Sequence, residues 1–304
     1  MTARRPSLLV SLLVIVALGG GAIGLVVWRD AVYGEPSPAE SVLYVRSGET
    51  LKRLSLSYAA LLADLYWVRA VQYYGGTRLS GARAKTYDQL YPLLDITTSL
   101  DPRFSVAYRF GAIFLAEPYP GGAGRPDLAI TLLEKGVRAN PGGWHYLQDI
   151  GFVFYWWTGD FRQAAAYFRK AADVPGAPWW LRSLAAVTLA QGGDRSTSRE
   201  LWQALRDSAT DEWLRNNASF RLAQLDALDA IDALAAQAKA YAARTGTWPA
   251  SWGVLARAGY LRGMPLDPTG VPYVLDGAAR AVTLSPESRL NPLPVGPRAA
   301  RPAR

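Results

Sequence analysis

Few side chains in this sequence could carry out acid–base, nucleophilic or metal chemistry. The one histidine is His145, in the tripeptide Trp144-His145-Tyr146, and cysteine is absent. A histidine-assisted hydroxyl nucleophile or a zinc site would have to be built around this residue. The sequence contains no Gly-x-Ser-x-Gly, no His-Glu-x-x-His and no phosphate-binding loop. We therefore predict no catalytic residue, no metal ligand and no cofactor, and expect His145 on a helix surface or in a groove.

The acidic residues form one regular pattern. Asp226, Asp229 and Asp232 recur every third residue in a long helical segment. A hard cation needs more converging oxygen ligands than one helix face supplies, so we interpret these carboxylates as a solvated face. Glycoside chemistry would need two facing carboxylates, and nothing in the sequence points to such a pair. An envelope hydrolase with unidentified carboxylates is the remote alternative, and it would need an acidic residue whose neutral substitution abolishes turnover without unfolding the chain.

The segment that would position His145 has the pattern of a helical hairpin. A helix with a small residue at Gly151 leads to the turn Gly159-Asp160, and a second helix follows with small residues at Ala164 and Ala171. Small residues let two helices approach closely, and aromatic residues between them fill the gaps to neighbouring helices. This hairpin resembles a tetratricopeptide (TPR) repeat, a unit that must stack on others and that binds partners rather than doing chemistry. The repeat-packing positions implied by the resemblance are Gly111, Ala129, Gly151, Ala164, Phe168 and Ala171.

Similar hairpins precede and follow this one. The closing prolines Pro102, Pro141 and Pro175 lie 39 and 34 residues apart, against a TPR period of about 34. The longer interval contains the Pro- and Gly-rich loop 117–122, which cannot continue a helix. A fourth, degenerate hairpin spans 180–205. The resemblance covers roughly residues 55–210 and predicts an α-solenoid of about four hairpins.

In stacked TPR hairpins the first helices line a groove, and the resemblance implies which side chains face it. An apolar, aromatic wall with a few polar groups suits an extended peptide or an amphipathic helix. The aromatic residues could instead pack against the next repeat and fill the groove, and an extra residue before Gly159 leaves the last two positions of the third repeat open. Ile113 and Asp149 stand where chaperone-binding TPRs place asparagines, so a C-terminal carboxylate ligand is not expected. The implied groove residues are Val106, Arg109, Ile113, Ala116, Glu117, His145, Gln148, Phe152, Tyr155 and Trp156.

The N-terminal segment is apolar. Leu8 to Trp28 contains no charge over 21 residues, enough for a helix to cross a hydrocarbon core of roughly 30 Å. Arg4 and Arg5 precede it, and acidic residues dominate the next stretch, so the positive-inside bias places the N-terminus in the cytoplasm. We expect a single-pass anchor in the inner membrane with the bulk of the chain periplasmic; a cleaved signal peptide is the alternative. A Gly-x-x-x-Gly spacing at Gly20 and Gly24 could let two anchors associate, although such glycines are common without a specific dimer.

The overall charge does not indicate nucleic-acid binding. The formal net charge is +8. However, several of the basic residues lie in the two termini and the rest are scattered, with no basic stripe interleaved with aromatic residues. We expect protein or peptide partners and no nucleic acid.

A small module is expected after the repeats. A long Ala-rich helix is predicted at about 211–245, and the turn around Pro268 and Gly270 should lead into a β-hairpin of 271–275 and 281–284. The string from Tyr241 to Tyr273 is similar to the C-terminal region of type II secretion major pseudopilins. The acidic calcium loop of that family has no counterpart in 278–289, so calcium is not implied.

Together these patterns predict a mainly α protein: a TPR-like solenoid after one transmembrane helix, with a small C-terminal α+β module. The expected function is a membrane-anchored, non-catalytic scaffold that binds proteins in the periplasm; the alternative is a secretion or pilus assembly component that contacts pseudopilins. The expected segments are 1–30 (anchor), 31–54 (linker with a short strand), 55–210 (repeats), 211–245 (long helix), 246–289 (module) and 290–304 (disordered basic tail).

Overall fold

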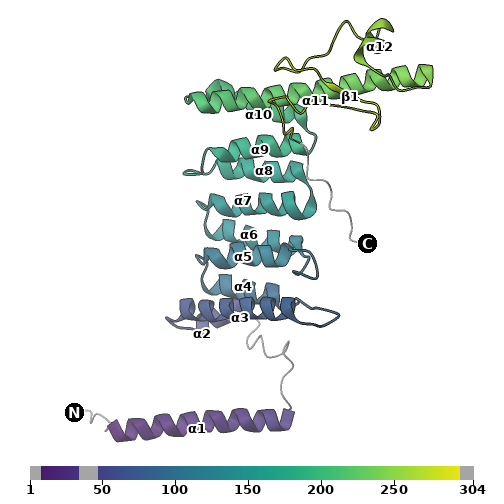
Figure 1. The fold of residues 1–304 in the computed structure, drawn as a ribbon. Coiled ribbons are helices and arrows are strands. Elements are labelled where there is room, and N and C mark those ends of the chain that lie inside the picture. Colours follow the sequence, from purple (N-terminus) through teal and green to yellow (C-terminus); the bar gives the residue numbers. More distant parts are fainter. Residues whose placement is uncertain (1–7, 34–46, 295–304) are drawn as a thin grey trace. The chain divides into compact units, whose positions relative to one another are not determined.

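The computed structural model describes residues 8–33 and 47–294, and in these it is mainly helical with one two-stranded antiparallel sheet, as the sequence predicts. Most of the expected linker with its short strand, at residues 34–46, and residues 295–304 lie outside the described residues. Figure 1 shows the elements. In chain order they are α1 (Leu8–Tyr33), α2 (Gly48–Leu54), α3 (Ala59–Leu79), α4 (Leu90–Leu100), α5 (Ser105–Ala116), α6 (Pro126–Ala139), α7 (Trp144–Val153), η1 (Phe154–Thr158), α8 (Phe161–Ala172), α9 (Trp180–Gln191), α10 (Arg195–Ser208), α11 (Glu212–Thr245), α12 (Trp252–Arg257), β1 (Val274–Asp276) and β2 (Ala281–Thr283).

The chain divides into two compact units. The first contains residues 1–107 and 120–123, and the second contains 108–119 and 124–304. In the first unit α4 packs against α2 and α3. A methyl group on Gly48 would meet the Cβ of Ser99 at 2.6 Å, so only glycine permits this close approach of α2 to α4. Buried Thr97 and Thr98 donate their hydroxyls to the carbonyls of Leu93 and Leu94, which satisfies them inside the helix.

The N-terminal helix α1 contains the segment that the sequence predicts as an anchor. Large apolar side chains described along it are well exposed, among them Leu13 at 68 %, Leu18 at 69 % and Trp28 at 60 %. In the part of the chain that the structure describes, none of the helices has both the length and the apolar character needed to cross a bilayer. The membrane anchor stays a prediction.

In the second unit each helix from α6 to α11 packs against the next one along the chain. Two of the turns between these helices share a glycine followed by an aspartate. Gly159 and Gly193 take positive φ angles of +70° and +83°, and the following Asp160 and Asp194 accept backbone N–H bonds as helix N-caps. A left-handed glycine ends one helix and the aspartate starts the next, so the chain reverses within a few residues.

Helices α7 and α8 approach each other closely at Gly151. A methyl group on Gly151 would meet the ring of Phe168 at 2.4 Å and the carbonyl oxygen of Ala164 at 3.1 Å. Gly136 of α6 similarly faces the rings of Tyr108 and Tyr146, which lie edge to face at 5.4 Å. All six residues expected at repeat-packing positions are buried: Gly111, Ala129, Gly151, Ala164, Phe168 and Ala171.

The segment in which the TPR resemblance implies an extra residue, before Gly159, forms η1, a single turn of π-helix. The amide of Gly159 donates to the carbonyl of Phe154, five residues earlier. A π turn holds one more residue than an α turn. The π turn therefore widens the end of the helix just before the Gly159-Asp160 turn.

The aspartates at every third position of α11 join it to α10. Arg199 binds Asp226 and Asp229, and Arg195 binds Asp229 at 3.1 Å and Asp232 at 2.6 Å. Their interpretation as a solvated face was incomplete: the aspartate side chains are 51–67 % exposed, and each is paired to a guanidinium group. Sequence spacing shows only that the carboxylates share a face, whereas the two arginines come from another helix.

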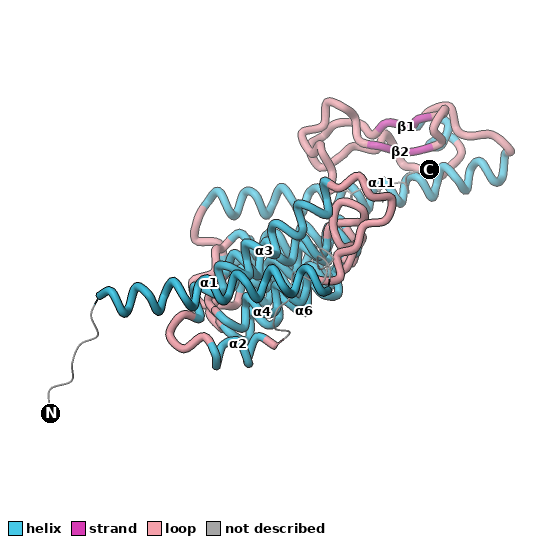
Figure 2. Tube along the Cα trace, turned by 90° about the horizontal axis from the view of Figure 1, so that it is seen from below, coloured by secondary structure: helices cyan, strands magenta, loops and turns pink. Residues whose placement is uncertain are grey.

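The C-terminal module packs on α11, beside which β1 and β2 lie in Figure 2. Trp252 donates its indole N–H to the carbonyl of Tyr273 at 2.8 Å, inside a cluster of buried side chains. The first strand begins at Val274 rather than at Val271 as expected. The reason is that the carboxylate of Asp267 binds the Val271 amide, which keeps that residue in the turn completed by Gly270.

The prediction that a disordered tail begins at residue 290 is wrong. Leu290 is 1 % exposed and belongs to the core of the module. The buried amide of Gln224 on α11 donates to the carbonyls of Leu290 at 2.7 Å and Pro292 at 2.9 Å. These two bonds hold the chain against α11, a long-range contact that composition could not indicate.

Candidate functional site

The predicted groove residues that lie on α5 and α7 in the second unit are Arg109, Ile113, Ala116, His145, Gln148 and Phe152. Arg109 holds the carboxylate of Asp149 with two N–H bonds, Nε to Oδ2 at 2.5 Å and Nη2 to Oδ1 at 3.2 Å. This hydrogen bond to Asp149 raises the pKa of the guanidinium. The pair is bidentate, which fixes both side chains in one orientation across two helices. We call Arg109, Phe110, Ile113, His145 and Gln148, with Asp149, the first-helix face.

His145 is half-buried on this face. Burial lowers the pKa of its imidazole, the charge of Arg109 lowers it further, and Asp149 acts in the opposite direction. The imidazole therefore stays neutral at neutral pH. Its ring centroid lies 4.3 Å from that of Tyr146 and 5.7 Å from that of Trp144. His145 contributes an aromatic edge and hydrogen-bonding nitrogens rather than a positive charge.

The apolar part of this face comes from α5. Phe110 is 53 % and Ile113 is 44 % exposed. Ala116 was expected on the groove and is instead 2 % exposed, because it follows Leu115 on the buried side of the helix. Glu117 is half-buried, and Val106, which belongs to the first unit, is 42 % exposed.

The aromatic groove residues of the third hairpin mostly pack inward. Phe152 meets Phe168 edge to face at 5.1 Å. Tyr155 meets Phe161 at 5.4 Å and donates its hydroxyl to Gln191 of α9 at 2.8 Å. Trp156 is 62 % exposed. At Phe152 and Tyr155 the groove is thus filled from within, the alternative that the sequence left open.

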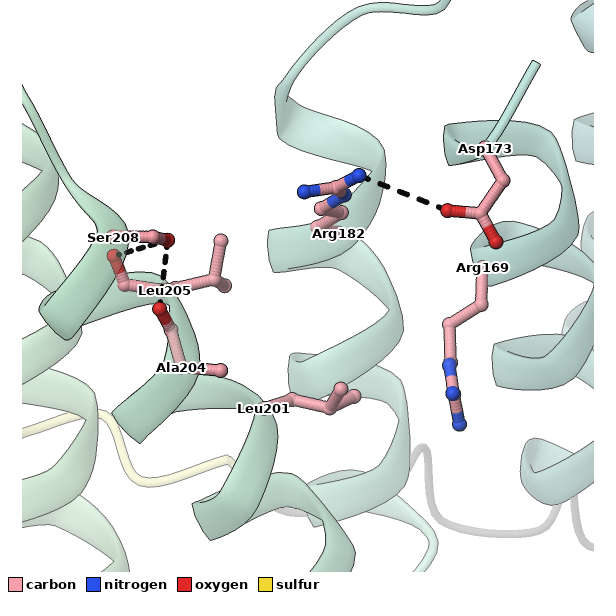
Figure 3. Close-up of a pocket in the computed structure, with 7 residues that line it drawn as sticks. All are labelled: Arg169, Asp173, Arg182, Leu201, Ala204, Leu205 and Ser208. Atoms are coloured by element: carbon pink, nitrogen blue, oxygen red, sulfur yellow. Dashed lines mark hydrogen bonds and ion pairs between the residues drawn. The ribbon is translucent and has the colours of Figure 1, made fainter.

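A cleft that the sequence did not reveal lies between α8 and α10. It has a volume of about 220 Å³ and is shown in Figure 3. Arg182 and Asp173 form a loose ion pair at 3.7 Å across its upper part, and Arg169 extends along its side. A second cleft of about 450 Å³ shares Arg169 and reaches Arg162. The two arginines are seven residues apart on α8, a spacing that places them on one face, and they could hold carboxylates of a partner.

Tryptophan side chains gather where α7, α9 and α11 begin. Trp144 and Trp180 lie edge to face at 6.3 Å, and Trp179 and Trp213 do so at 5.5 Å. Trp144, Trp180 and Trp213 are 36 and 33 residues apart, close to one repeat. This periodicity was the sequence signal that could have revealed them. We call Trp144, Trp179, Trp180 and Trp213 the tryptophan row.

Comparison with known protein families, with curated proteins and with solved structures finds no match to this chain. Its function has to be argued from its own surfaces. Within the described residues, His, Asp and Glu side chains do not form any group of three that could hold a metal ion.

Proposed function

We propose that this chain is a non-catalytic, TPR-like helical scaffold that binds protein partners. The observation that carries the proposal is the run of consecutive helices in the second unit, each packed on the next around small residues such as Gly151 and Ala164. Elements that contact only their neighbours along the chain form repeat arrays, and such arrays offer extended surfaces for recognition. The repeated Gly-Asp turns at Gly159 and Gly193 support the same interpretation.

The binding surface in this proposal is the first-helix face. Phe110 and Ile113 supply exposed apolar area, and the Arg109–Asp149 pair supplies charged hydrogen-bonding groups in a fixed orientation. An amphipathic helix or extended peptide with apolar anchors beside polar groups fits this combination. Fixing the polar groups in advance lowers the ordering cost of binding.

We also propose that α1 attaches the scaffold to the inner membrane, with the bulk in the periplasm. The supporting observations are the uncharged run from Leu8 to Trp28 and the exposure of the large apolar side chains that the structure describes in it. A helix that is apolar on all sides is stable only when something apolar covers it. The arginines that precede this run favour a cytoplasmic N-terminus.

Photo-crosslinking in intact cells tests the binding surface. A photoreactive amino acid at Ile113 is expected to capture a protein partner, and Arg109→Gln should reduce that capture because it removes the oriented guanidinium. The matched controls are the photoreactive residue at exposed Gln163 of α8 and the substitution Arg138→Gln at an exposed position of α6. Equal capture from Ile113 and Gln163, or capture unaffected by Arg109→Gln in a folded protein, would contradict the proposal.

A second candidate function is a component of a secretion or pilus assembly system, favoured by the C-terminal module alone. Its Pro- and Gly-containing turn precedes an antiparallel hairpin, with Leu275 paired to Val282. Met264 and Leu266 are 60 % and 55 % exposed there and provide an apolar contact. The same photoreactive residue at Met264 should then capture a pilin-like subunit, and capture of none in cells that assemble such a system would reject this candidate.

A further inference from the structure

Helix α3 of the first unit is apolar on two opposite faces. Its buried face, which packs on α4, carries small and aromatic side chains: Ala63, Tyr66, Ala70 and Tyr74. The opposite face exposes large apolar side chains, Leu61 at 54 %, Leu65 at 52 % and Val68 at 49 %. A helix that is apolar all round is usually buried on all sides. Adjacent exposed apolar side chains of this kind mark an interaction surface.

The exposed residues of α3 have the spacing of a coiled-coil seam. Alternating intervals of four and three residues lead from Leu61 through Leu65 and Val68 to Leu79. These are d and a positions of a heptad repeat, which face the partner helix in a coiled coil. In the same register the four buried residues fall at positions b, c and f, so the a and d positions face outward. We define the α3 seam as the following residues, all exposed except half-buried Gly75: Leu61, Leu65, Val68, Gln72, Gly75 and Leu79.

The charges beside the seam indicate a second copy of α3 as its occupant. Asp64 is exposed at position g, and Arg69 follows five residues later at position e. In a parallel pair the g position of one helix lies beside the following e position of the other, so two identical helices form two Asp64–Arg69 pairs. In an antiparallel pair g lies beside g and e beside e. Arg69 lies over the ring of Tyr66 in its own helix at 5.5 Å, and its five donors let it bind a second chain as well.

Gln72 supports the same arrangement. It stands at an a position, and in a parallel, in-register pair each a residue meets its own copy. An amide both donates and accepts hydrogen bonds, so two Gln72 side chains can bind each other. A polar residue at one a position fixes the register of a coiled coil at some cost in stability. The α3 seam is thus complementary to itself in its apolar residues, its charges and its polar position.

We propose that α3 pairs in parallel with α3 of a second copy of this chain along the α3 seam. The helix has 21 residues, which is three heptads. The contact is isologous, because Leu65 and Val68 bury apolar area against the same residues of the other copy. Each dimer presents two first-helix faces, so a partner with two binding segments gains avidity. That consequence rests on the proposed function, whereas the pairing rests on the first unit alone.

Disulfide cross-linking of single-cysteine variants tests the pairing in the full-length protein. The chain has no cysteine, so Leu65→Cys and Val68→Cys each supply one thiol at the seam. In the parallel, in-register pair each thiol lies beside its own copy. Mild oxidation of the purified protein should therefore give a covalent dimer on a non-reducing gel. Gln163→Cys, at an exposed position of α8, is the matched control and should remain monomeric.

Association through the apolar N-terminal segment has to be distinguished from pairing of α3. Gly20→Leu with Gly24→Leu removes the Gly-x-x-x-Gly spacing, and cross-linking of Leu65→Cys should persist in this background. Its loss would assign the association to the N-terminal segment and overturn the proposal. Absence of cross-linking at both seam positions, or equal cross-linking of Gln163→Cys, would also overturn it. A thiol at position 65 that neither cross-links nor reacts with a water-soluble maleimide would assign the face to lipid or to another protein, against the proposal.

Charge reversal tests the parallel orientation. Asp64→Arg should weaken the dimer several-fold in sedimentation experiments, because it replaces two attractive pairs with two repulsive ones. Asp64→Arg with Arg69→Asp restores opposite charges at the two positions and should recover most of the association. An unfolded variant would not show this recovery, so the result separates pairing from stability. A double variant that keeps the original helical circular dichroism and does not recover the association would overturn the parallel arrangement.

Discussion

At the scale of single residues, the first-helix face shows how burial and neighbouring charge together set the state of one side chain. His145 is flanked by Arg109, which disfavours its protonated form, and by Asp149, which favours that form. Because Arg109 and Asp149 are bound to each other, their effects partly cancel, and burial is the largest cause of the lowered pKa. The result is a neutral imidazole beside an intact ion pair.

The lowered pKa predicts a pH dependence of stability. The unfolded chain takes up a proton on its histidine near pH 6.5, whereas the folded chain does so only at lower pH. The unfolding free energy should therefore fall as the pH drops below about 6.5 and level off below the folded-state pKa. Denaturant unfolding between neutral pH and about pH 5 measures this slope.

The contribution of His145 to the pH dependence of stability can be separated from the contributions of the carboxylates. His145→Gln should remove the part of the slope near pH 6, and Arg109→Gln should raise the pKa of the imidazole because a nearby positive charge is lost. The chain has one histidine, so its titration can be followed by NMR without assignment of other imidazoles. A pKa above 6.5 in the unsubstituted protein would show that this account is wrong.

At the scale of elements, the distance between paired helices is set by glycine and alanine. Gly151 lets α7 approach α8 until the ring of Phe168 lies against its Cα. Between α10 and α11, the buried side chains of Trp202 and Leu222 belong to one apolar cluster. The guanidinium groups of Arg195 and Arg199 add ion pairs to aspartates of the facing helix. Exposed ion pairs contribute little free energy, so the packing of small residues contributes more to helix association than these ion pairs do.

The contact at Gly151 can be tested by one added methyl group. Gly151→Ala should destabilise the second unit by about 1–3 kcal/mol, because the new Cβ overlaps a ring and a backbone carbonyl that cannot both move away. Chemical denaturation monitored by circular dichroism measures the change. Gly76→Ala in α3 is the matched control: a Cβ there meets nothing within 4 Å, and alanine should be neutral or stabilising by up to about 1 kcal/mol. Equal stabilities of the two variants would contradict this packing argument.

At the scale of the whole molecule, the proposed scaffold needs a membrane attachment at one end and a binding surface in the second unit. The large apolar side chains that the structure describes on α1 are exposed, among them Leu18 and Leu25 at 69 % and 66 %. Exposed apolar area on this scale is costly in water and favourable in lipid.

The proposed membrane attachment predicts how the protein divides between the membrane and soluble fractions of a cell lysate. The full chain should remain with membranes through alkaline extraction, and a chain lacking residues 1–33 should be released. Leu18→Arg should weaken retention, since an arginine near the centre of a spanning helix costs about 2.5–3.5 kcal/mol. Leu54→Arg adds the same charge at an exposed leucine of α2 and should have no effect. Release of the full chain by salt alone would rule out the anchor.

The sequence by itself determined the local features of this protein. The mainly helical class, the helices from α3 to α11 and the turn at Gly270 follow from residue periodicity, glycine and proline positions and helix caps, which act between near neighbours. The TPR resemblance and the membrane anchor remain predictions from these local patterns.

Only the tertiary structure decided which side chains meet across long separations. Arg109 and Asp149 are 40 residues apart, and Gln224 and Leu290 are 66 apart. The same holds for the inward packing of Phe152 and Tyr155 and for the assembly of the tryptophan row. These contacts depend on how closely and at what angle helices pack, and that is set by the summed shapes of many side chains rather than by any short stretch of sequence.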